Sequence, residues 1–299
     1  MTDVSAPERC LLCEASSSLR PARFRQLYSQ AQGPPVEITW WVCRACAGWF
    51  AFPTPSVEQI ERHLASIRYN APSQADTIFT DKQRVFETIL DGLFRRKKTG
   101  RLLDFGCNYG HFLEFATGRG WEAVGFEPAP GPADYARQRG AEVRCAWSLD
   151  QAGFDDGTFD AIVAVDTFYY VWHPSDTLRT FHRLLRPGGV LVMRISNKNA
   201  FFRLVARLTR SRDKLDKRMS RLLGDHFHSI GMRPLAGVLA AIGFESVQVE
   251  PGATTVPLGS APRRTRWAYG LADWTRRLTA GRLVLSPGVL VWAMRRSDR

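Results

Sequence analysis

The sequence of 299 residues lacks any apolar run that approaches the ~20 residues needed to span a bilayer. Its N-terminus has no basic start followed by an apolar stretch, so a secretory signal peptide is not expected. A disordered or collagen-like composition is also absent, because 44% of the residues are hydrophobic and 23% are charged. These absences predict a cytoplasmic, globular protein of about two domains, with no transmembrane segment.

Acidic residues are scarce, since 29 Asp and Glu stand against 41 Lys and Arg for a net charge of +12. The basic excess lies in two segments. Residues 197–221 and residues 253–299 each contain nine Lys or Arg and two Asp, so each carries +7. Concentrated basic charge indicates an acidic partner: an anionic small molecule, a nucleic acid or an anionic membrane surface.

Cysteine is also sparse, and four of the six cysteines form two Cys-x-x-Cys pairs. Paired thiolates on two tight turns are typical of a tetrahedral zinc site. Two disulfides or unrelated reduced thiols are the alternatives, and a reducing cytoplasm disfavours disulfides. Four sulfur ligands would leave no open coordination position, so the predicted metal is structural. The predicted ligands are Cys10, Cys13, Cys43 and Cys46.

The cysteines define a small N-terminal module over residues 1–56, followed by a helical linker or lid over residues 57–99. Residues 36–43 are predicted to form a strand that leads into the second cysteine pair. Helical spacing begins after this module, at Val57, Ile60 and Leu64. The core of the module is predicted to be aromatic and to consist of Trp40, Trp41, Trp49, Phe50 and Phe52.

Residues 100–299 alternate short apolar strands with helical stretches, which predicts an α/β fold with a parallel sheet and helices on both faces. The two remaining cysteines, Cys107 and Cys145, are predicted to be buried in this core. The expected strands cover residues 101–105, 122–127, 141–145, 159–166, 190–196, 245–250 and 288–294.

A glycine-bearing turn follows the first of these strands. Gly106 is expected to let the backbone approach a ligand closely, and Gly110 to let the next helix pack on the strand. Glu127, at the tip of the second strand, suits the two hydroxyls of a ribose. The turn lacks the G-x-G-x-x-G spacing of a dinucleotide site, and Asp104 before it suits a cationic group. A nucleoside with a positively charged amino-acid tail is S-adenosylmethionine.

Over residues 85–250 the sequence resembles the class I S-adenosylmethionine-dependent methyltransferases, in the stretches LLDFGCNYGHFLEFA, VGFEPAP, FDDGTFDAIVAVDTFYYVWHPSDTL and FHRLLRPGGVLVMRISN. The resemblance implies a Rossmann-like sheet. The segment CRACAGWFAFPTPS is similar to the zinc-ribbon module that precedes this domain in a bacterial subgroup of sugar, polysaccharide and natural-product pathways. The resemblance places Asp104, Gly106, Cys107, Asn108 and Gly110 at the methionine end, Glu127 at the ribose, Ser148 near the adenine and Asp166 beneath the sulfonium.

The sequence departs from the family pattern at four positions. Asn108 replaces a usual glycine, and asparagine tolerates a left-handed backbone. Ser148 stands where an aspartate often contacts adenine. Glu14 and Ala47 follow the cysteine pairs, where glycine is common, and are expected to alter the geometry of the turns slightly without preventing zinc binding.

The predicted catalytic residues are His226, His173 and Tyr169, any of which would serve as a general base near the acceptor. A structural role is the alternative for each histidine. Tyr170 and His228 are further candidates.

The basic insert, residues 197–224, lies where related enzymes place a substrate lid. Its basic and apolar residues follow helical spacing on separate faces. A surface helix, a cap for an anionic substrate and a helix resting on a membrane are the three interpretations. The basic C-terminal segment, residues 253–287, is expected to pack beside this insert.

The leading interpretation of function is a methyltransferase that acts on an oxygen atom of an anionic small molecule, sugar, glycan or natural-product intermediate. Related sugar C-methyltransferases carry an additional C-terminal domain, which disfavours carbon as the acceptor. RNA methylation is the alternative suggested by the basic segments. A non-catalytic cofactor-binding scaffold is the third possibility.

Overall fold

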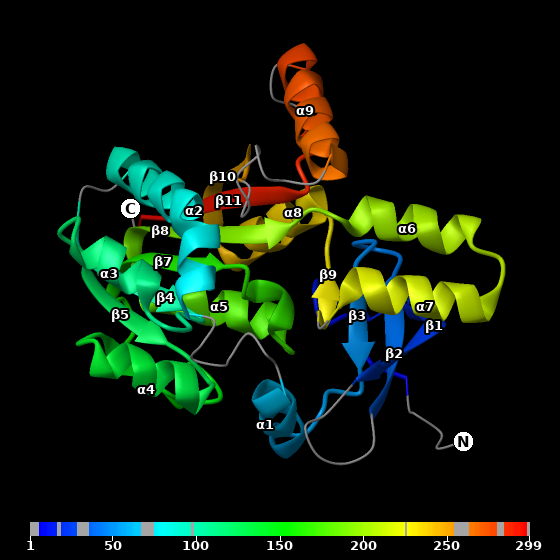
Figure 1. Cartoon of the computed structure of the whole chain (residues 1–299), viewed down its shortest axis with the longest axis horizontal. Helices are drawn as coiled ribbons and strands as arrows, with labels where there is room; N and C mark the ends of the chain where they lie inside the picture. The colour runs from blue at the N-terminus through cyan, green and yellow to red at the C-terminus, as the bar shows by residue number, and fades with distance from the viewer. Residues whose placement is uncertain are drawn as a thin grey trace. The chain divides into compact units, whose positions relative to one another are not determined.

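The computed structural model describes residues 6–16, 19–28, 36–66, 75–96, 99–224, 226–253, 263–279 and 284–297 (Figure 1). The chain divides into two compact units, each assembled from separated segments, whereas the sequence suggested consecutive domains. Unit 1 comprises Met1–Ser66, Tyr169–Leu178 and Asn197–Val238, and unit 2 comprises Ile67–Phe168, Arg179–Ser196 and Leu239–Arg299.

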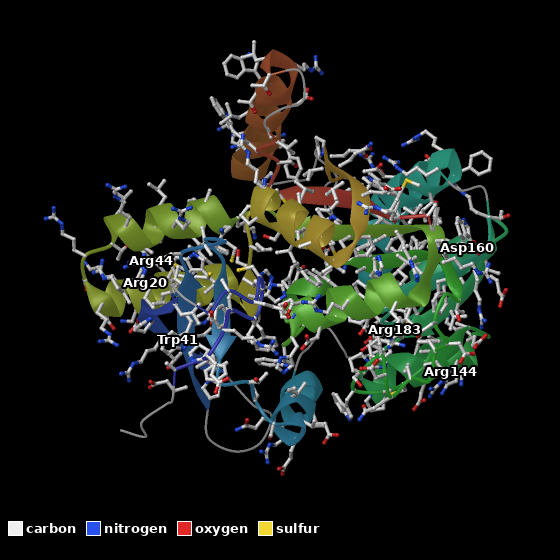
Figure 2. All side chains as sticks on the ribbon, turned by 180° about the vertical axis from the view of Figure 1, so that it is seen from behind. Arg20, Trp41, Arg44, Arg144, Asp160 and Arg183 are labelled. Carbon is white, nitrogen blue, oxygen red and sulfur yellow. The ribbon has the colours of Figure 1, made fainter. Side chains whose placement is uncertain are left out.

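Unit 1 contains an antiparallel sheet of four strands in the order β1-β2-β3-β9. β2 occupies the residues predicted from the sequence. Trp41, labelled in Figure 2, lies opposite Pro21 in β1 and Phe50 in β3. The strands are β1 (Leu19–Tyr28), β2 (Val36–Cys43), β3 (Trp49–Phe52) and β9 (His228–Ser229).

The basic insert folds as two helices of unit 1, α6 (Asn199–Leu208) and α7 (Arg212–Leu223), rather than as one helix. The break has a local cause, because the Ser211 hydroxyl accepts the Lys214 N–H and so begins a new helix. The apolar face of α7 recurs every fourth residue at Leu215, Met219 and Leu223, all of which are buried.

The core of unit 1 joins the aromatic side chains of the sheet to these helices, including Phe24, Trp40 and Trp49 of the strands and Phe202 of α6. Of the five predicted core aromatics, Trp40, Trp41, Trp49 and Phe50 are buried and Phe52 is half-buried. Another helix of this unit, α1 (Val57–Ser66), begins at the predicted position, although its Val57 side chain is 50% exposed.

Unit 2 contains a seven-stranded sheet in the order β10-β11-β8-β7-β4-β5-β6. All seven predicted strands are present. The sheet is mixed rather than parallel, because β11 pairs antiparallel with both β10 and β8. The strands are β4 (Arg101–Phe105), β5 (Glu122–Phe126), β6 (Glu142–Arg144), β7 (Phe159–Val165), β8 (Leu185–Ser196), β10 (Phe244–Pro251) and β11 (Gly288–Arg295).

Helix α2 (Ala75–Arg96) packs its apolar face on this sheet through Val85, Ile89 and Leu93. The approach is close at Gly92, where a Cβ would lie 2.4 Å from the Trp292 ring of β11. The other helices with residues in unit 2 are α3 (His111–Thr117), α4 (Pro130–Gln138), α5 (Pro174–Leu184), α8 (Met232–Ile242) and α9 (Arg263–Leu278), of which α5 and α8 belong partly to unit 1.

Buried polar contacts occur at the start of β4 in unit 2. The Asp160 carboxylate, labelled in Figure 2, accepts the Arg101 N–H at 2.9 Å and pairs with the Arg186 guanidinium at 2.9 Å. Cys107 is buried as predicted. Cys145 is exposed, so its predicted burial is wrong: it follows β6, an edge strand. Among the described residues, no helix is long and apolar enough to cross a membrane.

Candidate functional site

The turn after β4 adopts three left-handed residues: Gly106 at φ +76°, Asn108 at φ +49° and Gly110 at φ +79°. The predicted left-handed backbone of Asn108 is therefore confirmed. A Cβ on Gly106 would lie 2.3 Å from the Thr167 side chain, so packing within the protein already requires this glycine. A Cβ on Gly110 would lie 2.9 Å from Ala136 of α4. The close neighbour of Gly110 is thus a helix rather than the expected strand.

Glu127 follows β5, and its side chain is 7% exposed. One carboxylate oxygen accepts the Asn108 N–H and the other accepts the Ala129 N–H, each at 2.9 Å. Burial raises the pKa of Glu127 to about 7, although both hydrogen bonds act in the opposite direction. Each oxygen retains a lone pair for a further donor, such as a ribose hydroxyl.

Asp104 lies inside β4, opposite Gly125 of β5, and is 3% exposed. Burial raises the pKa of Asp104 to about 8. The positive charge of Lys82 counteracts this rise, and the charge of Glu127 adds to it. A buried carboxyl group with a high pKa suits a cationic ligand, because a positive charge would stabilise its ionised form.

Asp166 follows β7 and has the unusual φ of +58°. Its carboxylate pairs with the Lys82 ammonium of α2 at 3.2 Å and with the Arg194 guanidinium of β8. Burial acts to raise the pKa of Asp166, but the two cations outweigh it and hold the pKa below its ordinary value. Asp166 is therefore a permanent carboxylate of the site.

Neither Lys82 nor Arg194 is among the site residues predicted from the sequence. Arg194 left a visible signal, since it is a charged residue inside the apolar run VLVMRIS. Lys82 left none, because lysines are common on helices and only the fold brings this one to Asp166.

Two further residues were predicted to contact the cofactor, Ser148 and Cys107, and their surroundings give less support for such a contact. The Ser148 side chain is exposed, and its hydroxyl accepts the Gln151 N–H at 3.3 Å within a turn. Its contact with adenine stays a prediction. Burial raises the pKa of Cys107, so this thiol stays neutral. A Cβ on Gly125 would lie 2.5 Å from the Cys107 sulfur, which shows how closely β5 packs beneath the loop.

The side chains present fit S-adenosylmethionine. Asp104 is a buried carboxyl group that can accept a hydrogen bond from an amino group, the left-handed loop offers backbone groups beside it, and Glu127 is a buried acceptor for hydroxyls. All of these groups belong to unit 2 and come from the carboxyl ends of adjacent parallel strands, where ligands of this fold class bind.

The four paired cysteines converge in unit 1, with all four sulfurs within 4.8 Å of one another. The Cys10–Cys46 and Cys13–Cys43 sulfur pairs are each separated by 3.8 Å. Zinc–sulfur bonds of about 2.3 Å in a tetrahedron give sulfur separations of about 3.8 Å, so the cluster has the size of a zinc site.

The turns that present the sulfurs have left-handed residues at the two positions where the family usually has glycine. Glu14 has φ +59° and Ala47 has φ +51°. The Ala47 carbonyl accepts the Asn199 side-chain N–H at 3.0 Å, which links the second cysteine turn to α6. Asn199, buried and unpredicted, thus supports the cysteine module from the basic insert.

Two of the three predicted catalytic residues meet in unit 1. The rings of Tyr169 and His226 stack with centroids 3.8 Å apart, and the Tyr169 carbonyl accepts the Phe227 N–H. His173 is exposed, and its carbonyl accepts the Thr177 N–H in the first turn of α5. His228 is buried in β9. The catalytic assignments themselves stay predictions.

The seven-stranded order with one antiparallel strand, together with the acidic residues at the carboxyl ends of β4 and β5, defines a Rossmann-like methyltransferase fold. Residues 78–249 match the family model described as a methyltransferase domain, which is more than half of the chain. The protein belongs to this methyltransferase-domain family.

Curated relatives and a solved structure agree with this assignment. The chain is 34% identical over 104 residues to a ubiquinone biosynthesis O-methyltransferase of Ruegeria pomeroyi, covering 33% of the chain and 42% of the relative. It is 26% identical over 200 residues to a malonyl-[acyl-carrier protein] O-methyltransferase of Paenibacillus sp., covering 61% and 66%. The chain thus spans less than two thirds of either relative's length. A Thermotoga maritima S-adenosylmethionine-dependent methyltransferase has a similar fold, with a TM-score of 0.51 at 16% identity over 76% of this chain and 98% of that one.

Proposed function

We propose that the protein is an S-adenosylmethionine-dependent methyltransferase that methylates an oxygen atom of an anionic small molecule. The buried pair of carboxyl groups, Asp104 and Glu127, carries this proposal, because together with the left-handed loop it matches the two polar ends of the cofactor. S-adenosylmethionine supplies the methyl group on a cationic sulfur.

The residues of unit 2 would bind and orient the cofactor. Asp104 would accept a hydrogen bond from its amino group, and Glu127 would accept from the ribose hydroxyls while the Asn108 and Ala129 N–H groups hold its carboxylate in place. Asp166 is paired with Lys82 and Arg194, and its place beneath the cationic sulfur stays a prediction.

Two observations support an oxygen acceptor on an anionic molecule. The curated relatives from both named groups are O-methyltransferases. On α6 and the turn after it, Arg203, Arg207 and Arg210 are exposed and offer positive charge to an anion. Sugars, glycans and natural-product intermediates with an acidic group are the candidate acceptors.

His226 is the proposed general base for removing the acceptor proton. Its stacking on Tyr169 fixes the plane of the imidazole, which a base needs. His173 is a weaker candidate, because its backbone begins α5 and its side chain is exposed. We expect His226→Gln to lower kcat without changing cofactor affinity, and His173→Gln to change kcat little.

The four cysteines are proposed to hold a structural zinc ion. The sulfur separations support this assignment, and four thiolates would leave the metal no position for a substrate. The metal would then stabilise unit 1 rather than take part in methyl transfer.

The decisive test uses S-adenosylmethionine with a labelled methyl group. Purified protein and labelled cofactor are added to extract of a strain that lacks the gene, and label is counted in the small-molecule, glycan, lipid, protein and RNA fractions. Glu127→Gln serves as a variant without cofactor binding, and Glu114→Gln on α3 is its matched control. Protein-dependent label in small molecules or glycans, lost only in Glu127→Gln, is the expected result.

Other distributions of label would overturn parts of the proposal. Label in RNA would favour the RNA alternative. Retained S-adenosylhomocysteine binding with no label in any fraction would favour a non-catalytic scaffold. For the anionic acceptor, charge reversal by Arg203→Glu and Arg207→Glu is expected to raise the apparent acceptor KM and leave cofactor affinity intact. Unchanged acceptor KM in both variants would remove this role from α6.

A further inference from the structure

Helix α9 (Arg263–Leu278) is labelled in Figure 1. It carries an exposed apolar stripe that the proposed function does not use. Trp267 is 78% exposed, Leu271 is 49%, Trp274 is 59% and Leu278 is 66%. Their spacing of four, three and four residues places them along one face of the helix. Isolated exposed apolar residues are ordinary, but four in a line that include two tryptophans form a contiguous patch.

The stripe points away from the part of unit 2 on which α9 rests. Ala272 is buried, and the Tyr269 hydroxyl lies 3.5 Å from the position of a Cβ on Gly288 in β11. At 100° per residue, both positions fall on the side of the helix opposite the stripe. One face of α9 therefore packs on unit 2, and the opposite face, which carries the tryptophans, is exposed.

The charge beside the stripe identifies that partner. Arg263, Arg266 and Arg277 are exposed and follow one flank of the stripe, and α9 as a whole contains five arginines against one acidic residue, Asp273. Asp273 is already paired with Arg277 at 2.8 Å. Tryptophan and leucine on one face with arginines at its edge are typical of a helix that lies in the interface of an anionic membrane.

The charge and the side chains of this face disfavour two other binding partners, a second copy of the chain and a single-stranded nucleic acid. A second copy of the chain pairing through α9 would bring two sets of arginines together with little acidic charge to offset them. A single-stranded nucleic acid would stack on the tryptophans, but Leu271 and Leu278 alternate with them and offer no flat ring to a base. Acyl chains, in contrast, accept leucine and tryptophan alike.

We propose that α9 docks the protein on an anionic lipid surface through Trp267, Leu271, Trp274 and Leu278, with the arginines of its flank contacting the lipid phosphates. The proposal concerns this surface alone and holds whichever acceptor the enzyme methylates. Three flanking arginines, at roughly fivefold each, predict on the order of a hundredfold tighter binding to anionic than to neutral vesicles at low salt.

The test measures partitioning of the full-length protein onto phosphatidylcholine vesicles with and without phosphatidylglycerol, by flotation and by quenching of tryptophan fluorescence with brominated lipids. Binding that requires phosphatidylglycerol and weakens with salt is expected. The double variant Trp267→Ser/Trp274→Ser is expected to lower the partition coefficient at least tenfold. The matched control is Phe94→Ser on α2, which removes another exposed aromatic side chain (60% exposed) and is expected to bind as the wild type does.

A second comparison separates α9 from α6, which also carries exposed apolar residues. Phe201 and Leu208 of α6 are 51% and 69% exposed. If Phe201→Ser/Leu208→Ser abolished vesicle binding while the α9 double variant retained it, the proposal would be overturned. No vesicle binding, together with self-association or RNA binding that the α9 variant removes, would overturn it in favour of that occupant. Circular dichroism of each variant checks that the helices are intact.

Discussion

Asp104 illustrates, at the scale of a single residue, a conflict between stability and binding. Its carboxyl group has a folded-state pKa of about 8 against an ordinary value of 3.8. The folded protein therefore holds a proton that the unfolded chain releases, and stability is lost as pH rises from about 4 to about 8. A cationic ligand that binds the ionised Asp104 carboxylate would restore the lost stability, which explains why an acidic residue occupies this buried position.

We accordingly predict that Asp104→Asn raises the free energy of unfolding by roughly 3–5 kcal/mol more near pH 9 than near pH 5, and removes cofactor binding. Denaturant unfolding at both pH values and calorimetric titration with S-adenosylhomocysteine measure the two effects. Asp155→Asn, on an exposed loop, is the control and should change neither. Equal stabilisation at both pH values would show that the ionised carboxylate is not the cause.

Ala47 is a second residue whose backbone conformation departs from what its side chain favours. An alanine at φ +51° sits in the left-handed region at a cost of about 1–2 kcal/mol, which glycine would avoid. In an Ala47→Gly variant, the relief of this strain is partly offset, because glycine increases the conformational entropy of the unfolded chain.

We expect Ala47→Gly to be stabilising by up to about 1 kcal/mol, measured by denaturant unfolding with zinc added to the protein. Ala51→Gly, in the buried and extended strand β3, should instead destabilise it, since that backbone gains nothing from glycine. A destabilising Ala47→Gly would mean that the Ala47 methyl contributes packing that outweighs the strain.

At the scale of secondary-structure elements, the sequence predicts what is periodic and misses what depends on partners. The strands of unit 2 were predictable because each is a short apolar run between turn residues. β11 could be found in this way, but its antiparallel direction could not, because direction depends on where the chain returns to the sheet. The division of the basic insert into α6 and α7 depends on one serine cap, whose signal is weak beside continuous helical spacing.

Helix α7 shows what the insert contributes to unit 1. Leu215 is fully buried in the core that includes Phe24 and Trp40. We predict that Leu215→Ala lowers the free energy of unfolding of unit 1 by about 2–4 kcal/mol, because it leaves a cavity among aromatic side chains. Leu204→Ala on α6 makes the same change at a side chain that is 52% exposed and should cost little. Equal effects of the two substitutions in thermal unfolding would contradict a shared core.

At the scale of the whole molecule, two units with separate cores divide the two proposed ligands between them. The cysteine cluster belongs to unit 1, and Asp104 and Glu127 belong to unit 2. The cysteines were predictable because their spacing is a local signal. The Lys82–Asp166–Arg194 cluster was not, since its three residues are far apart in the sequence and only the packing of α2 on the sheet brings them together.

This division predicts two thermal transitions in calorimetry. A chelator should lower the midpoint of the transition of unit 1, because a structural metal contributes directly to folding. S-adenosylhomocysteine at about a hundred times its Kd should stabilise unit 2 by about 2.7 kcal/mol and leave the other midpoint in place. A single transition that shifts with both ligands would show that the units unfold together.

The shared core of unit 1 also determines how the protein can be cut. The cysteine module comes first in the sequence given, and from its position alone it could be taken for a separable domain. Phe202, Leu215 and Met219, however, are buried against its strands although they lie well over a hundred residues later. Removing the front of the chain would expose the apolar faces of α6 and α7, so the cysteine module and the insert have to be transferred together to another protein.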